Sequence, residues 1–278
     1  MNNKIKNFLF FLFFYFFFLN FSFASLLNPK GDISIQQKHI IIISFFTMLI
    51  IVLPVIFMSL YFSYKYNKKN NEIYKPNWNH SNIIEFFIWL IPIIIVFFLS
   101  IVSWNSTHKL EPSKILMHKN SYINIDVVSL NYKWFFIYPE KKIAILNKIV
   151  IPVNTPIMFR VTSNSVMNSF FIPSLGSQIY SMAGMINKLN LISNESGLYK
   201  GISANYSGVG FSDMKFKVIV TPDFKTFNEW VEYIKNYSEK LNTIKKFNKI
   251  SNIDNYKNDC FSGVNKNLFD QIVNKFHN

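Results

Sequence analysis

The sequence predicts a membrane protein with a two-helix transmembrane hairpin, an exported all-β domain and a C-terminal helical extension. Two apolar runs, 40–62 and 83–104, are each long enough to cross a bilayer core of ~30 Å. Over 121–221, apolar residues alternate with polar ones, which is typical of β-strands. A helix-start signal and helically spaced apolar residues then follow within 222–278.

Residues 1–24 have the features of a secretory signal peptide. Two lysines precede an apolar run of twelve residues, and Ser22–Ala24 supplies a small-x-small cleavage site. The run is shorter than the ~20 residues that a spanning helix needs. We expect cleavage after Ala24 and an exported segment over 25–39. The alternative is an uncleaved third membrane helix.

The two long apolar runs are expected to form the hairpin. The run 40–62 contains Pro54, which a membrane helix tolerates. The connecting segment 63–82 is rich in lysine, so the positive-inside rule places it in the cytoplasm. The run 83–104 then returns the chain to the outside, where the linker 105–120 leads into the β domain.

Glu85 lies near the cytoplasmic end of the second apolar run. An ionised carboxylate at the centre of a bilayer costs roughly 2.5–3.5 kcal/mol, and less near the surface. Two interpretations remain open. Glu85 is either an interfacial residue whose side chain reaches water, or an entry group for protons or ions.

Several short strands are predicted within 121–221. Alternation is clearest over 123–127, 157–162, 189–191 and 214–220, and proline, glycine and asparagine separate these segments. Closely spaced short strands favour a sandwich or a barrel.

The C-terminal extension is predicted to begin at a helix. Thr221 is expected as its N-cap and Pro222 as its first helical residue. Its apolar face comprises Phe227, Trp230, Val231 and Ile234. The Asn/Lys-rich segment 236–258 is interpreted as a connector of low complexity, and a last short amphipathic helix is predicted over 267–276.

Composition excludes several classes of function. The net charge of +14 comes almost entirely from lysine, which the codon bias of an AT-rich genome explains, and no basic stripe supports nucleic-acid binding. The single Cys260 excludes an intrachain disulfide. The histidines lie beside the apolar runs or near the C-terminus, at His39, His80, His108, His118 and His277. We therefore expect no catalytic residue in this chain.

Several long segments resemble subunit II of haem-copper terminal oxidases, in the branch of the cytochrome bo-type ubiquinol oxidases. The chief ones are Tyr132–Glu140, Val161–Met185 and Tyr199–Lys217. Shorter matches are Leu27–Gly31, Pro76–Asn82, Thr107–Lys114 and Leu268–Phe276. The resemblance implies a cupredoxin-like fold for the β domain. It also implies a bacterial inner-membrane location with that domain in the periplasm.

In copper-bearing members of the family, the β domain holds a dinuclear copper centre. The resemblance places its ligand positions at Asn168, Ser203, Asn205, Ser207, Phe211 and Met214. Copper needs thiolate and imidazole ligands in this geometry. Only Met214 keeps the family's residue, so the copper site is expected to be vacant and the chain to bind no cofactor.

The resemblance implies a non-redox subunit of a proton-pumping oxidase that reduces oxygen to water in the aerobic respiratory chain. Subunit I is expected to oxidise ubiquinol and to carry the haems and the remaining copper. The other expected partners are smaller membrane subunits and the lipid bilayer. Glu85 matches the family's glutamate at the cytoplasmic mouth of a proton channel. A lipobox cysteine, common among relatives, is missing from the region around Ser22, so lipidation is not expected.

Two alternative functions share part of this pattern. A copper-bearing subunit II of cytochrome c oxidase is disfavoured by the missing ligands. A membrane-anchored cupredoxin-like binding module unrelated to respiration would purify without a haem-bearing partner.

Overall fold

The computed structural model describes residues 26–67, 80–116, 121–252 and 259–277. The predicted signal peptide and the lysines of the predicted cytoplasmic segment after Lys65 lie outside these residues. The chain divides into two units, one formed by 36–111 and the other by the remaining residues.

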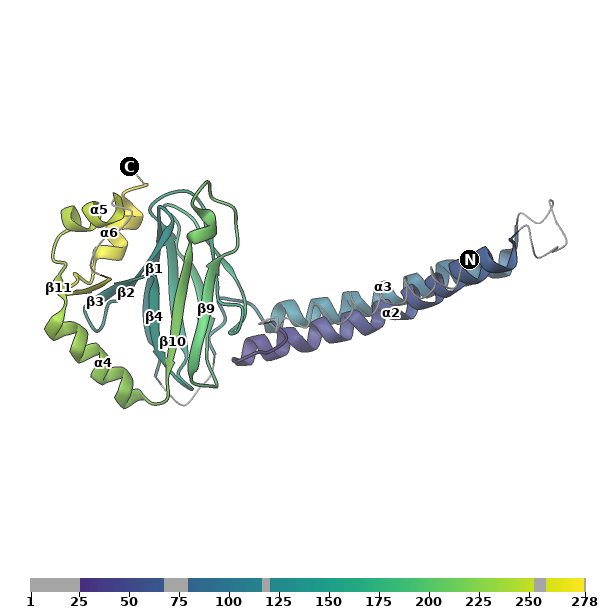
Figure 1. The fold of residues 1–278 in the computed structure, drawn as a ribbon, viewed down its shortest axis with the longest axis horizontal. Coiled ribbons are helices and arrows are strands. Elements are labelled where there is room, and N and C mark those ends of the chain that lie inside the picture. The colour runs from purple at the N-terminus through teal and green to yellow at the C-terminus, as the bar shows by residue number, and fades with distance from the viewer. Residues whose placement is uncertain (1–25, 68–79, 117–120, 253–258, 278) are drawn as a thin grey trace, which may run out of the picture. The chain divides into compact units, whose positions relative to one another are not determined.

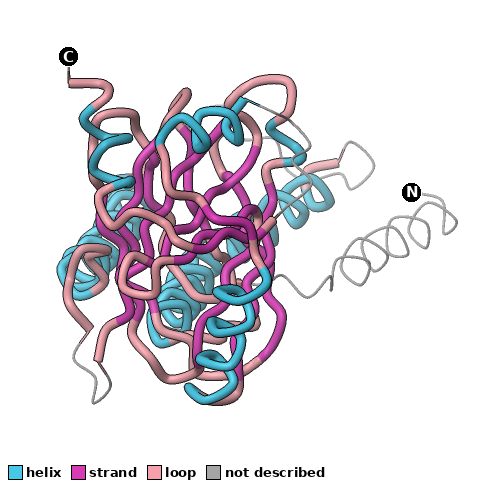
Figure 2. Tube along the Cα trace, turned by 90° about the vertical axis from the view of Figure 1, so that its left-hand side faces the viewer, coloured by secondary structure: helices cyan, strands magenta, loops and turns pink. Residues whose placement is uncertain are grey.

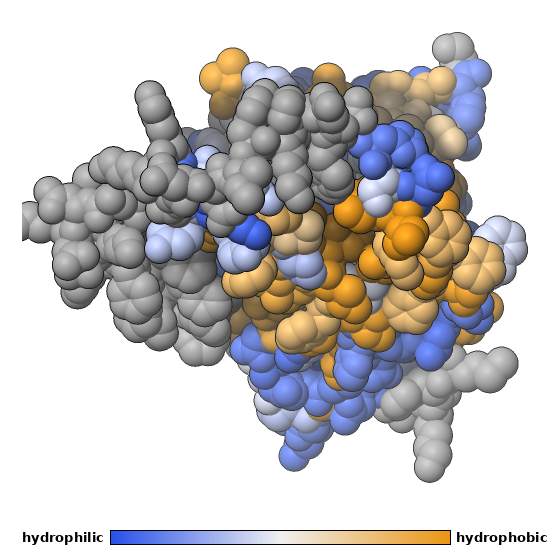
Figure 3. Space-filling view, turned by 90° about the vertical axis from the view of Figure 1, so that its right-hand side faces the viewer, coloured by the Kyte–Doolittle hydropathy of each residue, from blue (hydrophilic) through white to orange (hydrophobic). Residues whose placement is uncertain are grey.

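The first unit consists mainly of two long helices, α2 (Asp32–Lys65) and α3 (Asn82–Lys109) (Figure 1). Both are long and apolar enough to cross a membrane, and both extend beyond the apolar runs that predicted them. Exposed apolar side chains are concentrated on these helices, and Figure 3 shows a broad apolar surface. Such a surface is stable in lipid and would aggregate in water.

The second unit is built on two β-sheets (Figure 1, Figure 2). The seven-stranded sheet has the order β11-β12-β3-β2-β1-β5-β8, and the five-stranded sheet has the order β4-β10-β9-β6-β7. The strands are β1 (Ile123–Leu130), β2 (Lys133–Tyr138), β3 (Ile143–Leu146), β4 (Lys148–Pro152), β5 (Ile157–Ser163), β6 (Asn168–Phe171), β7 (Ile179–Ser181), β8 (Asn187–Leu191), β9 (Gly197–Ser203), β10 (Lys215–Thr221), β11 (Glu239–Lys240) and β12 (Cys260–Ser262). The sequence predicted a sandwich or a barrel, and the two sheets form a sandwich.

Aromatic side chains fill the space between the two sheets. Trp134 and Phe136 of β2 lie against Phe170 of β6 and Phe216 of β10. The rings of Phe170 and Phe216 are stacked, with centroids 5.2 Å apart. All four side chains are buried, so they form the centre of the sandwich.

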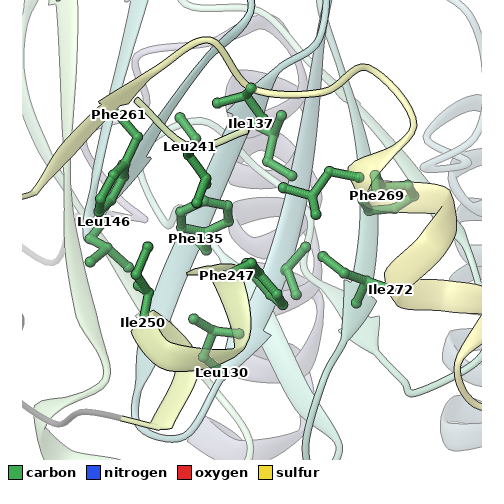
Figure 4. Close-up of a cluster of buried hydrophobic side chains, with 14 of the residues drawn as sticks. Leu130, Phe135, Ile137, Leu146, Leu241, Phe247, Ile250, Phe261, Phe269 and Ile272 are labelled. Carbon is green, nitrogen blue, oxygen red and sulfur yellow. The ribbon is translucent and has the colours of Figure 1, made fainter. Parts of the chain in front are cut away.

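The other face of the seven-stranded sheet is covered by the C-terminal extension (Figure 4). Phe135 of β2 contacts Phe247 and Phe261, with ring centroids 5.4 and 6.1 Å apart. Strand β2 is therefore buried along its whole length, and its sequence shows no alternation. A strand covered on both faces reads as a continuous apolar run.

The extension is more ordered than its sequence predicted. It contains α4 (Phe224–Tyr237), α5 (Ile244–Asn252) and α6 (Leu268–Asn274), and the strands β11 and β12 add it to the seven-stranded sheet. The helix α6 confirms the predicted last helix. The interpretation of 236–258 as a mere connector was wrong, because α5 buries Phe247 and Ile250 in the cluster of Figure 4.

The start of α4 differs from the prediction by two residues. Thr221 is the last residue of β10 and pairs with Pro152. Asp223 is the N-cap, and its Oδ1 accepts a hydrogen bond of 2.7 Å from the backbone N–H of Thr226. The Asp223 carboxylate accepts this hydrogen bond directly. The N-cap is therefore Asp223, after Pro222, rather than Thr221, before it.

Candidate functional site

Strand pairing brings together two of the six positions that the resemblance assigned to copper. Asn168 begins β6 and Ser203 ends β9, and these strands are antiparallel with Phe170 opposite Ser203. The Ser203 hydroxyl donates a hydrogen bond of 3.3 Å to Asn168 Oδ1. Both residues are buried.

Met214 and Asn205 adjoin Ser203 through their backbones. The Ser203 N–H donates to the Met214 carbonyl at 3.1 Å, and the Ser203 hydroxyl lies 3.4 Å from the Asn205 carbonyl. Met214 is buried, immediately after a 3₁₀ turn over Phe211–Asp213. The structure thus gathers Asn168, Ser203, Asn205 and Met214 at the same end of β6 and β9.

Ser207 and Phe211 lie in the loop between β9 and β10. Their side chains make no hydrogen bond to Asn168 or Ser203 within the described residues. The Phe211 ring lies against Tyr206, with centroids 5.8 Å apart. The Ser207 hydroxyl is buried and lacks a partner in the described structure.

Tyr132 supports this loop from the turn between β1 and β2. A Cβ added to Gly210 would lie 2.4 Å from a ring carbon of Tyr132, and one added to Gly208 would lie 2.7 Å from its Oη. Gly208 also has a φ of +120°, which side chains rarely allow. The loop therefore needs glycine at both positions to approach the ring.

A network of buried amide and hydroxyl groups extends inward from Asn168. Asn168 Nδ2 donates to the Val166 carbonyl at 3.1 Å and to Ser129 Oγ at 3.4 Å. Ser129 Oγ lies 2.9 Å from the hydroxyls of both Ser163 and Ser181. Each of these serines is fully buried. Mutual hydrogen bonding offsets the desolvation of these polar groups.

The donor types at the six positions do not fit a dinuclear copper centre. They offer amides, hydroxyls, one aromatic ring and one thioether, and no thiolate or imidazole. Soft thiolates and imidazoles are the ligands that copper requires in such a site. In the part of the chain that the structure describes, no group of three or more His, Cys, Asp or Glu side chains could hold a metal ion.

Glu85 lies in the first turn of α3, and its backbone N–H donates to the Ser81 carbonyl at 3.0 Å. His80 Nε2 is 3.2 Å from Glu85 Oε1. The sequence indicated a role for Glu85 and assigned none to His80. The usable signal was a histidine just before the helix start and an acid in its first turn, because one helical turn brings such residues close together.

These features define a class of protein: a chain with two helices able to cross a membrane and a separate β-sandwich domain. A family model described as "Cytochrome C oxidase subunit II, transmembrane domain" matches residues 30–105. The model described as "Cytochrome C oxidase subunit II, periplasmic domain" matches residues 118–221. Relatives 47–52% identical over most of the chain show that it belongs to the family of cytochrome bo(3) ubiquinol oxidase subunit 2.

Two relatives that carry that name are similar over most of the chain. The subunit of Buchnera aphidicola subsp. Baizongia pistaciae is 52% identical over 252 residues, which are 90% of this chain and 88% of the relative. The subunit of Pseudomonas aeruginosa is 47% identical over 253 residues, 91% and 76% of the two chains. These matches confirm the resemblance found in the sequence.

Among solved structures, the periplasmic domain of subunit II of cytochrome oxidase from Bradyrhizobium japonicum is similar in part. It is 21% identical, with a TM-score of 0.40, and covers 43% of this chain and 96% of its own. The periplasmic family model ends at residue 221, so the extension from α4 onward lies beyond the matched domain.

Proposed function

We propose that this chain is the non-redox subunit II of a proton-pumping ubiquinol oxidase that reduces oxygen to water in the aerobic respiratory chain. The relatives named above support the class of complex. The observation that carries the non-redox role is the hydrogen bond between Asn168 and Ser203, where copper-bearing members have ligands. The two side chains form a hydrogen bond with each other. Neither supplies a thiolate or an imidazole that could bind a metal.

The electron route follows from this loss. Without a copper centre in the β domain, electrons do not enter through it from a soluble cytochrome. Ubiquinol is oxidised within the membrane on subunit I, which carries the haems and the remaining copper. This chain acts as a scaffold for subunit I and the smaller membrane subunits, in the bacterial inner membrane.

Glu85 supplies the second role, a carboxylate at the cytoplasmic mouth of a proton path into subunit I. Its side chain is 53% exposed in the described chain and lies in the first turn of α3. An ionisable side chain within a membrane-spanning helix is a functional candidate by default. The amino-terminal end of a helix also stabilises a carboxylate.

Metal analysis tests the non-redox role. The full-length chain, purified without subunit I, is expected to hold no stoichiometric copper. A variant with Asn168→His, Ser203→Cys, Ser207→Cys and Phe211→His is expected to bind copper and to show thiolate–copper absorption. The matched control carries Ser203→Ala and Ser207→Ala, which supply no ligands. Stoichiometric copper in the unmodified chain would refute the proposal.

Turnover of the intact complex tests the proton-entry role. Glu85→Gln is expected to slow oxygen consumption by about tenfold while assembly with the haem-bearing subunit survives. Glu229→Gln, an exposed acid on α4, is the control and should leave turnover unchanged. Normal turnover of the Glu85 variant would show that this carboxylate is only an interfacial residue.

A further inference from the structure

We propose that His80 passes protons from the cytoplasmic water to Glu85. The inference rests on the proposed role of Glu85 as the proton-entry carboxylate, and it assigns the group that loads it. Its basis is the contact of 3.2 Å between His80 Nε2 and Glu85 Oε1. That distance is within the reach needed for direct proton transfer between side chains.

The start of α3 fixes this pair. Ser81 is the N-cap and has an extended backbone, with φ −152° and ψ 108°. The helix then turns so that the Glu85 N–H bonds to the Ser81 carbonyl at 3.0 Å. This first turn brings the carboxylate back over the residue that precedes the cap, and that residue is His80.

Both side chains also reach the surroundings. The exposed fractions of the His80 and Glu85 side chains are 60% and 53%. An open depression on α3 adjoins the carboxylate and is otherwise lined by Asn82, Phe86, Trp89, Leu90 and Ile93. None of these can carry a proton at neutral pH, so within the described residues His80 is the ionisable side chain that contacts Glu85.

Among the described residues at this end of the helices, the other charged side chain is that of Lys65. Lys65, at the end of α2, has its ammonium 5.8 and 5.5 Å from the ring centroids of Tyr61 and Tyr66. It forms no ion pair with Glu85. On α3, the next ionisable side chains after Glu85 are His108 and Lys109, in the last turn.

The proton passes through the His80 imidazole in two steps. A hydronium ion in the cytoplasmic water delivers a proton to Nδ1 of the neutral imidazole, which leaves water and an imidazolium. The imidazolium releases its Nε2 proton to Glu85 Oε1, and the carboxylate becomes a neutral carboxyl group. The ring returns to its first tautomer by proton exchange with water. Imidazole suits this role because one ring nitrogen can accept a proton while the other releases one.

Oxygen consumption by the intact oxidase in membranes, measured from pH 6 to pH 8, tests the proposal. His80→Gln keeps an N–H that can bond Glu85 but cannot relay a proton. We expect it to slow turnover about 3- to 10-fold at pH 8 and less than about 2-fold at pH 6. The difference arises because direct collection of protons from water slows as their concentration falls.

Two further variants separate the possible outcomes. His80→Gln added to Glu85→Gln should slow turnover no further, because His80 acts through Glu85. His108→Gln, at the far end of α3, should leave the pH profile unchanged. If Glu85→Gln slows turnover while His80→Gln matches the unmodified oxidase at pH 8, the relay is wrong and Glu85 keeps its role. If Glu85→Gln has no effect, the proton-entry role itself fails.

Discussion

Arg160 holds both carboxylate oxygens of Asp126 from the neighbouring strand. Arg160 Nε is 2.6 Å from Asp126 Oδ1, and Nη2 is 2.8 Å from Oδ2. The two residues are directly opposite in the parallel pair β1 and β5. The guanidinium also lies over the Phe269 ring, 4.6 Å from its centroid, and 3.5 Å from Asp270. This ion pair therefore connects the sandwich to α6.

Replacing Asp126 by asparagine should destabilise the chain strongly. The carboxylate is fully buried, and burial raises the pKa of Asp126 while the Arg160 guanidinium acts to keep it ionised. Removing the buried carboxylate leaves the Arg160 guanidinium with only the half-exposed Asp270, 3.5 Å away. Because Arg160 is 28% exposed, we expect the lower end of the usual range, a loss of roughly 3 kcal/mol in the free energy of unfolding.

Denaturant titration of the full-length chain in detergent, followed by tryptophan fluorescence, measures this loss. Glu232→Gln is the matched control, because Glu232 pairs with Lys235 at 2.7 Å on the exposed face of α4. An exposed pair is worth no more than about 1 kcal/mol. Equal losses in the two variants would show that the Asp126 pair contributes no more than a surface pair.

The sequence predicts a helix or strand correctly where its residue pattern is specific to that kind of element. The two apolar runs gave the membrane helices, and alternation gave β1, β5, β8 and β10. Strand β2 could not be recognised in this way, because Trp134 faces one layer and Phe135 the other. Helix α5 was missed because its burial depends on contact with Phe135 of β2, a residue far away in the sequence.

Replacing Tyr138 by phenylalanine should also destabilise the chain. The Tyr138 hydroxyl donates to the Val150 carbonyl at 2.8 Å and accepts from the Val150 N–H at 3.0 Å. Val150 is in β4, the end strand of the five-stranded sheet, so this hydroxyl completes its backbone bonding. Leaving buried backbone groups unpaired is expected to lower stability by about 1–3 kcal/mol.

The burial of the Tyr138 hydroxyl also predicts alkaline sensitivity. Burial raises the pKa of the Tyr138 phenol, so the folded chain retains a proton that the unfolded chain loses above pH ~10. Stability from this group is complete below pH ~10 and falls as the pH rises further. Unfolding measured from pH 9 to pH 11 should show a smaller decline in Tyr138→Phe. The exposed Tyr237→Phe should keep the decline of the unmodified chain.

The candidate site was predictable in its residue types and only partly in its contacts. The spacing of the copper-ligand motif in the family located Asn168, Ser203 and Met214, which the structure places together. The hydroxyls of Ser129 and Ser181 could not be foreseen, because serine on a strand gives no sign of which strand faces it. His80 was missed because its contact depends on where α3 begins.

Phe247→Ala should show that the extension is part of the core of the β domain. Phe247 is fully buried in the cluster of Figure 4, against Phe135. Removing such a ring leaves a cavity, which is expected to lower stability by about 3–5 kcal/mol. Phe224→Ala is the control, since Phe224 is 46% exposed at the start of α4. A loss no larger than that of the control would show that α5 is only loosely attached.

Asp223 should stabilise the start of α4 in a pH-dependent manner. The hydrogen bond from Thr226 lowers the pKa of the Asp223 carboxyl below its usual range. A carboxyl whose pKa falls on folding contributes stability that is present above its unfolded pKa of ~3.9 and is lost as the pH falls through the folded value.

Asp223→Ala should lower the melting temperature by roughly 2–4 °C at neutral pH. Asp223→Asn keeps an oxygen acceptor for the cap, so it should melt near the unmodified chain at neutral pH and lose this acid dependence. Thermal melts of the full-length chain by circular dichroism at pH 7 and pH 3 measure both effects, and an unchanged melting temperature for Asp223→Ala at pH 7 would contradict the role of Asp223 as the N-cap.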